Sequence, residues 1–340
     1  MVTDMRQVIG NDKLKRRILS AVRSRNFTHA CIIEGAPGSG KHLIARNTAA
    51  ALCCENTRDI NTEVPCRMCR NCRIIFDDKC PDVITVGAQG KSSVGVEAAR
   101  FITGDANSYP NMLPYRIYII EDADKMTAQA QNAFLLTLEE PPSFVKFFLL
   151  CENASVLLET VRSRAPVFRT ERLSDDIITD FLRNGNERFN SLDKNSQKEL
   201  ILLSKGTIGE ALSLLEGGKL TEKIELKKFA ADFVEAAISE KDAPKVITLL
   251  SLFSSKREML SEQIYFILSA LRDLILLKKK EDARLEFFTD QDKALGICDC
   301  ATQKGLLDFA SALYGALDGI ARNANTKLTV LKILTDAGIV

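Results

Sequence analysis

A glycine-rich turn between a short apolar run and a helical segment constrains this chain most. Residues 30–34 predict a buried strand, residues 41–52 have helical composition, and the turn between them fits G-x-x-x-x-G-K. In this context backbone N–H groups wrap a phosphate and the lysine reaches the outer phosphates. A chance glycine-rich turn is the alternative. We expect an ATP cofactor to contact Gly35, Pro37, Gly38, Ser39, Gly40 and Lys41.

The metal side of this nucleotide site departs from the usual pattern. His42 stands where a hydroxyl normally binds Mg²⁺, and the strand at residues 116–120 ends in Glu121 and then Asp122. The usual order is Asp then Glu, and a carboxylate misplaced by about 1 Å can cost about 10²-fold in rate. We therefore expect degraded Mg²⁺ binding at these three residues and little or no ATPase from the chain alone. A solvent-facing histidine and a solvated acidic strand end are the alternatives.

The order of strand and helix signals predicts the fold. Strand-like runs at residues 30–34, 82–86, 116–120, 146–151 and 167–170 alternate with segments of helical period, which indicates a parallel sheet with flanking helices. After residue 170 the strand signal ends and the chain reads as all-α. A length of 340 residues suggests two or three domains, at about 100 to 200 residues each. We predict an α/β P-loop domain at 1–170 and helical domains at 171–216 and 217–340.

Composition narrows the class of protein. The chain is 46% hydrophobic and 27% charged, which is typical of a packed globular protein and excludes a disordered or collagen-like one. Its 46 basic and 45 acidic residues give a net charge of +1, so strong DNA or membrane binding by the chain alone is not expected. No leader and no long apolar run are visible, and we expect a cytoplasmic protein without a membrane partner.

A cluster of cysteines predicts a structural metal. Cys66, Cys69 and Cys72 follow one another at x₂ spacings, and Cys54 lies upstream as a fourth sulfur donor. Four thiolates suit a closed tetrahedral Zn²⁺ site, which we place in a module at 54–72. The neighbouring Cys53 and Cys80 leave the outer ligands open, and reduced core cysteines are the alternative to a metal. A nucleic-acid zinc module is a further alternative, although basic and acidic residues balance over residues 54–80.

Several motifs together resemble the bacterial clamp-loader ATPases of DNA polymerase III, an AAA+ family. The match covers about the first 215 residues well and the helical remainder loosely. It implies an AAA+ domain, a helical lid at 171–216 and a helical collar for oligomerisation at 217–340. The matching segments are the glycine-rich loop, the cysteine insert, Cys80 to Val83, Glu121 to Met126, Asn132 to Pro142 and Thr160 to Ala165.

Within that family the resemblance implies a stator subunit that does not hydrolyse ATP. His42, the Glu-Asp order and Gly209, which stands where hydrolysing tau/gamma subunits carry a sensor arginine, are all departures from an active site. Ser163 and Arg164 resemble the motif whose arginine reaches ATP on a neighbouring subunit as a trans arginine finger. The implied partners are the tau/gamma and delta subunits and, through the assembly, the sliding clamp and primer-template DNA. An active tau/gamma-type ATPase is the alternative.

Overall fold

Five parallel strands form one sheet in the computed structural model, in the order β2-β3-β4-β1-β5. Each predicted strand is present, and its ends differ from the prediction by one residue at most. This confirms the α/β P-loop AAA+ fold, with a parallel sheet and flanking helices, that the sequence predicts. The strands are β1 (Ala30–Glu34), β2 (Val83–Val86), β3 (Arg116–Ile120), β4 (Val145–Cys151) and β5 (Val167–Arg169).

The structure describes residues 5, 8–57, 59, 62–88, 93–240, 243–280 and 285–336. The chain divides into two compact units. The first comprises Met1–Phe181 together with Gly206–Glu210, and the second comprises Leu182–Lys205 and Ala211–Val340. The three domain boundaries drawn from the sequence stay a prediction.

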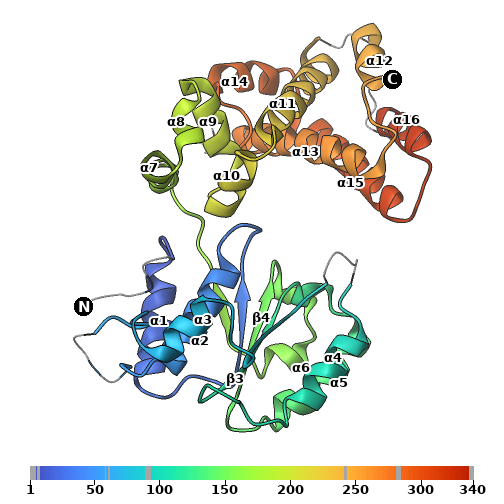
Figure 1. Ribbon diagram of the computed structural model, residues 1–340. Coiled ribbons are helices and arrows are strands. Elements are labelled where there is room, and N and C mark those ends of the chain that lie inside the picture. The colour runs from blue at the N-terminus through green and yellow to red at the C-terminus, as the bar shows by residue number, and fades with distance from the viewer. Residues whose placement is uncertain are drawn as a thin grey trace. The chain divides into compact units, whose positions relative to one another are not determined.

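Helices cover both faces of the sheet (Figure 1). Alternate strand residues point to opposite faces, so Cys31 and Ile33 pack with α1, α2 and α3, whereas Ala30 and Ile32 pack with α4 and α5. The sheet is therefore buried on both sides, as its apolar strands require. The helical elements of this part are α1 (Asp12–Arg23), α2 (Lys41–Cys53), α3 (Arg70–Phe76), α4 (Val96–Asp105), α5 (Ala128–Glu139) and α6 (Glu159–Arg162), with short 3₁₀ turns at η1 (Ala123–Lys125) and η2 (Ala154–Val156).

Helix α5 begins and ends where the sequence predicts. The Thr127 hydroxyl accepts a hydrogen bond from the Ala130 N–H at 3.1 Å, which satisfies one of the free donors of the first turn. Pro141 and Pro142 follow the last turn and cannot continue a helix. Phe134 and Leu138, one turn apart, are buried against the sheet. The helix therefore fixes the segment that leads from β3 to β4.

The rest of the chain is helical, as predicted. Its core gathers buried residues of α11, α13, α14, α15 and α16. None of the helices in the described part of the chain has the length and apolar character that crossing a bilayer requires. The elements are α7 (Asp175–Gly185), α8 (Glu187–Ser191), α9 (Lys194–Leu203), α10 (Ile208–Leu214), α11 (Lys219–Glu235), the π-helical η3 (Ala236–Glu240), α12 (Ala243–Leu250), α13 (Arg257–Lys279), α14 (Gln291–Asp299), α15 (Gln303–Ala321) and α16 (Thr326–Asp336).

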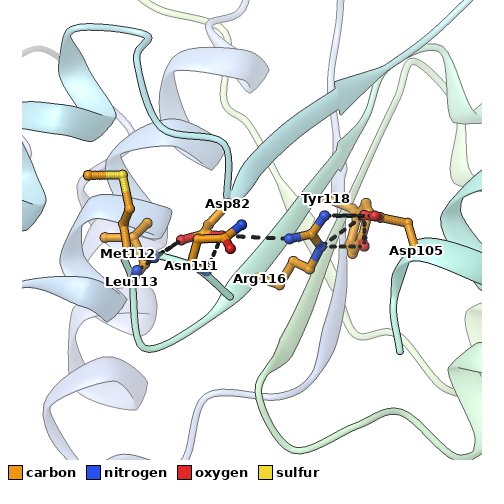
Figure 2. Close-up of polar contacts among 7 residues, drawn as sticks. All are labelled: Asp82, Asp105, Asn111, Met112, Leu113, Arg116 and Tyr118. Carbon is orange, nitrogen blue, oxygen red and sulfur yellow. Dashed lines mark hydrogen bonds and ion pairs between the residues drawn. The ribbon is translucent and has the colours of Figure 1, made fainter. Parts of the chain in front are cut away.

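A buried carboxylate holds the loop that enters β3. Asp82 is fully buried and accepts the N–H groups of three successive residues, Asn111, Met112 and Leu113, at 2.6–2.9 Å (Figure 2). Arg116 lies between two acids, with Nη1 3.6 Å from Asp82 and Nη2 2.6 Å from Asp105. The hydroxyl of Tyr118 also donates to Asp105. This network fixes the start of β3 and therefore the position of its acidic end.

Replacing Asp82 with alanine is expected to destabilise the first unit by about 3–5 kcal/mol, because the change leaves three N–H groups and one side of Arg116 unpaired in the interior. Thermal unfolding followed by circular dichroism measures the loss. Asp77, which is exposed, provides the matched control, and its replacement with alanine should leave the transition within error of the wild type. Equal transitions for the two variants would contradict a supporting role for Asp82.

Candidate functional site

The glycine-rich loop joins β1 to α2 at the carboxyl edge of the sheet. Gly38 and Gly40 have φ of +71° and +82°, in the left-handed region that favours glycine. The Ser39 hydroxyl is buried within the loop and has no hydrogen-bond partner among the described residues. A phosphate oxygen would satisfy it, because buried hydroxyls are nearly always paired. The loop therefore fits a phosphate group.

Lys41 lies at the start of α2 with its amine over the loop. Its Nζ donates to the Gly35 carbonyl at 2.7 Å and to the Ala36 carbonyl at 3.0 Å. Partial burial lowers the pKa of Lys41, and the negative charge of Glu152 acts in the opposite direction. The amine is thus held by backbone oxygens at the position from which a lysine contacts phosphates in such loops.

The acidic end of β3 meets His42 rather than a hydroxyl. His42 Nε2 is 3.8 Å from Glu121 Oε1, and both side chains are about half exposed. Asp122 has a left-handed φ of +51°, and its Oδ1 lies 3.0 Å from Lys125 Nζ. The structure thus brings His42 and Glu121 together and leaves Asp122 paired with a lysine. A hydroxyl ligand for Mg²⁺ is replaced by an imidazole, which suits this hard cation poorly.

Side chains hydrogen-bond to the backbone of the residues that follow β4. Asn153, whose amide could otherwise orient a water molecule, accepts the Ser155 N–H at 2.9 Å and caps η2. Glu34 accepts the Ala154 N–H at 3.2 Å. Asp124, which the sequence did not single out, accepts the Glu152 N–H at 2.9 Å and ties the ends of β3 and β4 together. The Asn153 amide oxygen is therefore engaged within its own turn.

A contact between two glycines, not foreseen from the sequence, covers part of the loop. The Gly209 N–H donates to the Gly38 carbonyl at 2.9 Å. A Cβ on Gly209 would lie 2.6 Å from Gly38 Cα, and a Cβ on Gly38 would lie 2.5 Å from the Glu210 nitrogen. Only residues without a side chain allow backbones to approach this closely. The glycine at position 209 is the signal that could have indicated the contact.

The four predicted cysteines form one cluster. The sulfurs of Cys54, Cys66, Cys69 and Cys72 all lie within 4.8 Å of one another. Zinc bonds of about 2.3 Å in a tetrahedron separate sulfurs by about 3.8 Å, so the donor set fits a tetrahedral metal. Among the described residues, neither Cys53 nor Cys80 belongs to this cluster. The structure brings together the ligands that the sequence proposed.

Hydrogen bonds to sulfur shape the cysteine cluster. The Cys69 N–H donates to Cys66 Sγ and the Cys72 N–H donates to Cys69 Sγ, both at 3.4 Å. The hydrogen bond between the Cys54 and Cys72 sulfurs lowers the pKa of Cys54 and, together with burial, raises the pKa of Cys72. Arg67 donates to the Asn47 side chain and lies over the Phe76 ring at 4.5 Å. Arg67, a basic residue of the cysteine module, is therefore engaged within the chain.

Arg164 lies just after α6, on the surface of the first unit. Its Nη2 is 2.7 Å from Glu139 Oε1, and its Nη1 donates to the Thr160 carbonyl at 2.9 Å. Ser163 Oγ donates to the same carbonyl and lies 3.3 Å from Arg164 Nη1. About a third of the arginine side chain is exposed. Residues of α5 and α6 thus position a guanidinium that remains open to solvent.

Comparison with known proteins identifies the family. A family profile described as DNA polymerase III, delta subunit, matches residues 10–174. DNA polymerase III subunit gamma of Buchnera aphidicola from Acyrthosiphon pisum is 30% identical over 280 residues, which cover 77% of this chain and 76% of that protein. The chain belongs to the DNA polymerase III clamp-loader subunit family. Subunit tau of Escherichia coli is 29% identical over 210 residues, 62% of this chain and 32% of tau.

Clamp-loader relatives have also been solved. A gamma subunit-related protein of Thermotoga maritima is 18% identical and covers 94% of this chain and 98% of its own, with a TM-score of 0.48. The 30% identical Buchnera relative, and not this structure, confirms the sequence-based assignment to the clamp-loader family. The curated relatives quoted above carry the names gamma and tau, so the finer assignment to a stator is not among these findings.

Proposed function

We propose that this clamp-loader subunit is of the delta-prime type, a stator that assists ATP-dependent loading of the sliding clamp on primed DNA without hydrolysing ATP itself. The observation that carries the proposal is the contact between Gly209 and Gly38. A side chain at position 209 would begin 2.6 Å from Gly38 Cα, so the sensor arginine of an active subunit is incompatible with this arrangement. The backbone of Gly209 thus contacts the glycine-rich loop at the position from which the sensor arginine of an active subunit would contact phosphate.

The metal side of the loop supports the same proposal. His42 faces Glu121 where a hydroxyl and an aspartate would hold Mg²⁺, and Asn153 is used as a helix cap. The hydroxyl ligand, the aspartate and a free Asn153 amide, all of which would serve hydrolysis, are thus missing together. Lys41 and the backbone cradle for phosphate are kept. ATP binding without turnover is the behaviour that this combination supports.

We further propose roles for the arginine and the cysteines. Arg164 acts as a trans arginine finger on ATP held by a neighbouring tau/gamma subunit, with Ser163 beside it. The proposed partners are the tau/gamma and delta subunits. The sliding clamp and primer-template DNA are bound by the assembled loader. The cysteine cluster holds a structural Zn²⁺, since four thiolates in tetrahedral reach leave no open position for catalysis.

An active gamma/tau-type ATPase is the second candidate. It is favoured by the names of the quoted relatives and by the intact Lys41. Hydrolysis by the isolated chain separates the two proposals, because turnover that depends on Lys41 is expected of an active subunit and not of a stator whose own site is degraded.

We expect the purified chain with Mg²⁺ and ATP to show no Lys41-dependent turnover. Steady-state phosphate release by the wild type and by the Lys41→Ala variant should differ by less than about twofold. The site lacks the hydroxyl ligand and the sensor arginine, so it stabilises the transition state too weakly for the loss of Lys41 to lower the rate further. A parallel ATP titration reports binding separately. Robust release that the Lys41→Ala variant abolishes would refute the stator and favour the gamma/tau type.

A further inference from the structure

A cavity of about 520 Å³ lies in the first unit, at the opposite ends of the strands from the glycine-rich loop. Phe27 and Tyr115 precede β1 and β3, and Lys146 is the second residue of β4, so the cavity lies at the amino ends of these strands. The loop leaves β1 at its carboxyl end. The cavity is therefore separate from the nucleotide site, and its volume lies in the range of small-molecule pockets.

The lining of this cavity carries an excess of positive charge. Among the described lining residues, Arg23, Arg25 and Lys146 are cationic and Glu55 is the one carboxylate, and the proposed zinc ligand Cys54 lies at the cysteine wall. Among the described residues, none of the three cations makes an ion pair. An arginine fork matches a phosphate or carboxylate, and three cations against one acid match a ligand with two negative charges.

Lys146 is the least expected of these cations. It is half-buried, and its amine donates to the Phe27 and Thr28 carbonyls at 3.1 and 3.3 Å, which leaves one of its three donors available. Its amine also lies 5.3 Å from the centre of the Tyr115 ring. Burial lowers its pKa. A half-buried ammonium group without a carboxylate is costly unless an anion pairs with it.

The cysteine module supplies one wall of the cavity. Cys53, Cys54 and Thr57 line it, and the Thr57 hydroxyl donates to the Cys54 carbonyl at 2.5 Å. The Asn71 side chain donates to the Cys53 carbonyl at 2.9 Å. The wall is thus fixed by hydrogen bonds, and the aromatic rings of Phe27 and Tyr115 offer an apolar surface beside the charges.

We propose that this cavity binds a phosphate monoester, with its phosphoryl group among Arg23, Arg25 and Lys146 and its apolar body against Phe27 and Tyr115. A phosphate monoester carries nearly two negative charges at pH 7, which matches the excess of cations, whereas a carboxylate carries one. Inorganic phosphate would leave most of the volume unfilled, so an organic body is part of the ligand.

Calorimetric titration of the full chain with phenyl phosphate at low salt tests the proposal. We expect saturable binding that Arg25→Gln and Lys146→Met each weaken by about tenfold or more, since each removes a charged hydrogen bond to the ligand. Arg322→Gln, an exposed arginine of the second unit, is the matched control and should leave the affinity unchanged. Arg25 is exposed, so its variant is expected to fold even if Lys146→Met does not.

Three outcomes would overturn the proposal. The first is no saturable binding of phenyl phosphate. The second is binding that Lys41→Ala abolishes while Arg25→Gln retains it, because the ligand would then occupy the glycine-rich loop. The third is equal affinity for inorganic phosphate and phenyl phosphate, which would show that Phe27 and Tyr115 do not bind an apolar part of the ligand. Retention of binding in Lys41→Ala supports the assignment to this cavity.

Discussion

Replacing Arg164 with alanine is expected to lower ATP turnover at the neighbouring subunit by about 10³-fold, the lower end of the effect of arginine fingers in GTPases. The guanidinium is partly exposed and is held by Glu139 and the Thr160 carbonyl. We therefore expect it to reach a docked γ-phosphate without first leaving a buried site. DNA-stimulated ATPase of the reconstituted loader, followed through a single turnover, measures the loss.

Two further variants make the Arg164 experiment specific. Arg162 is exposed at the end of α6, two residues before Arg164, and its replacement with alanine should leave turnover unchanged because it is not part of the proposed Ser163–Arg164 finger. Arg164→Lys keeps the charge but loses the two-pronged geometry, so partial activity is expected. Assembly is checked by gel filtration for each variant. Normal turnover by an assembled Arg164→Ala loader would rule out the finger.

The sequence predicted most of the fold because its signals are local and strong. Each strand is a short apolar run between polar turns, and α5 is bounded by a threonine cap and two prolines. The cysteine spacing likewise predicted the cluster, since ligands three residues apart around a turn lie within reach of one ion. Local pattern was sufficient for these features.

The features that the sequence did not reveal depend on residues that are distant along the chain. Gly38 and Gly209 meet only because the fold returns residues 206–210 to the glycine-rich loop, and although a glycine at 209 indicates a close approach, it does not say which residue is approached. The sequence predicted Asp82 only as the first residue of a strand, yet it is fully buried and its carboxylate holds the turn before β3. The cationic cavity joins residues from α1, the cysteine module and β4. No local period indicates such a site.

Removal of zinc is expected to have the largest effect on this chain. Structural Zn²⁺ contributes about 10–16 kcal/mol in zinc-finger peptides, which is more than any single side chain contributes. Within the described part of residues 54–72, the core includes Cys54, Val64 and Cys72, and two of these three are proposed metal ligands. We expect purified protein to carry about one Zn²⁺ per chain. Chelation should unfold this module while the parallel sheet persists.

Metal analysis and hydrogen exchange test this prediction together. Cys72→Ala should lose the metal and the exchange protection of the amides in residues 62–76, because three thiolates leave the ion one ligand short. Cys80→Ala is the matched control, since Cys80 is also buried but lies outside the cluster. It should retain both metal and protection. Protein that was never exposed to chelator and contains no zinc would refute the site, and loss of metal from Cys80→Ala would reassign its fourth ligand.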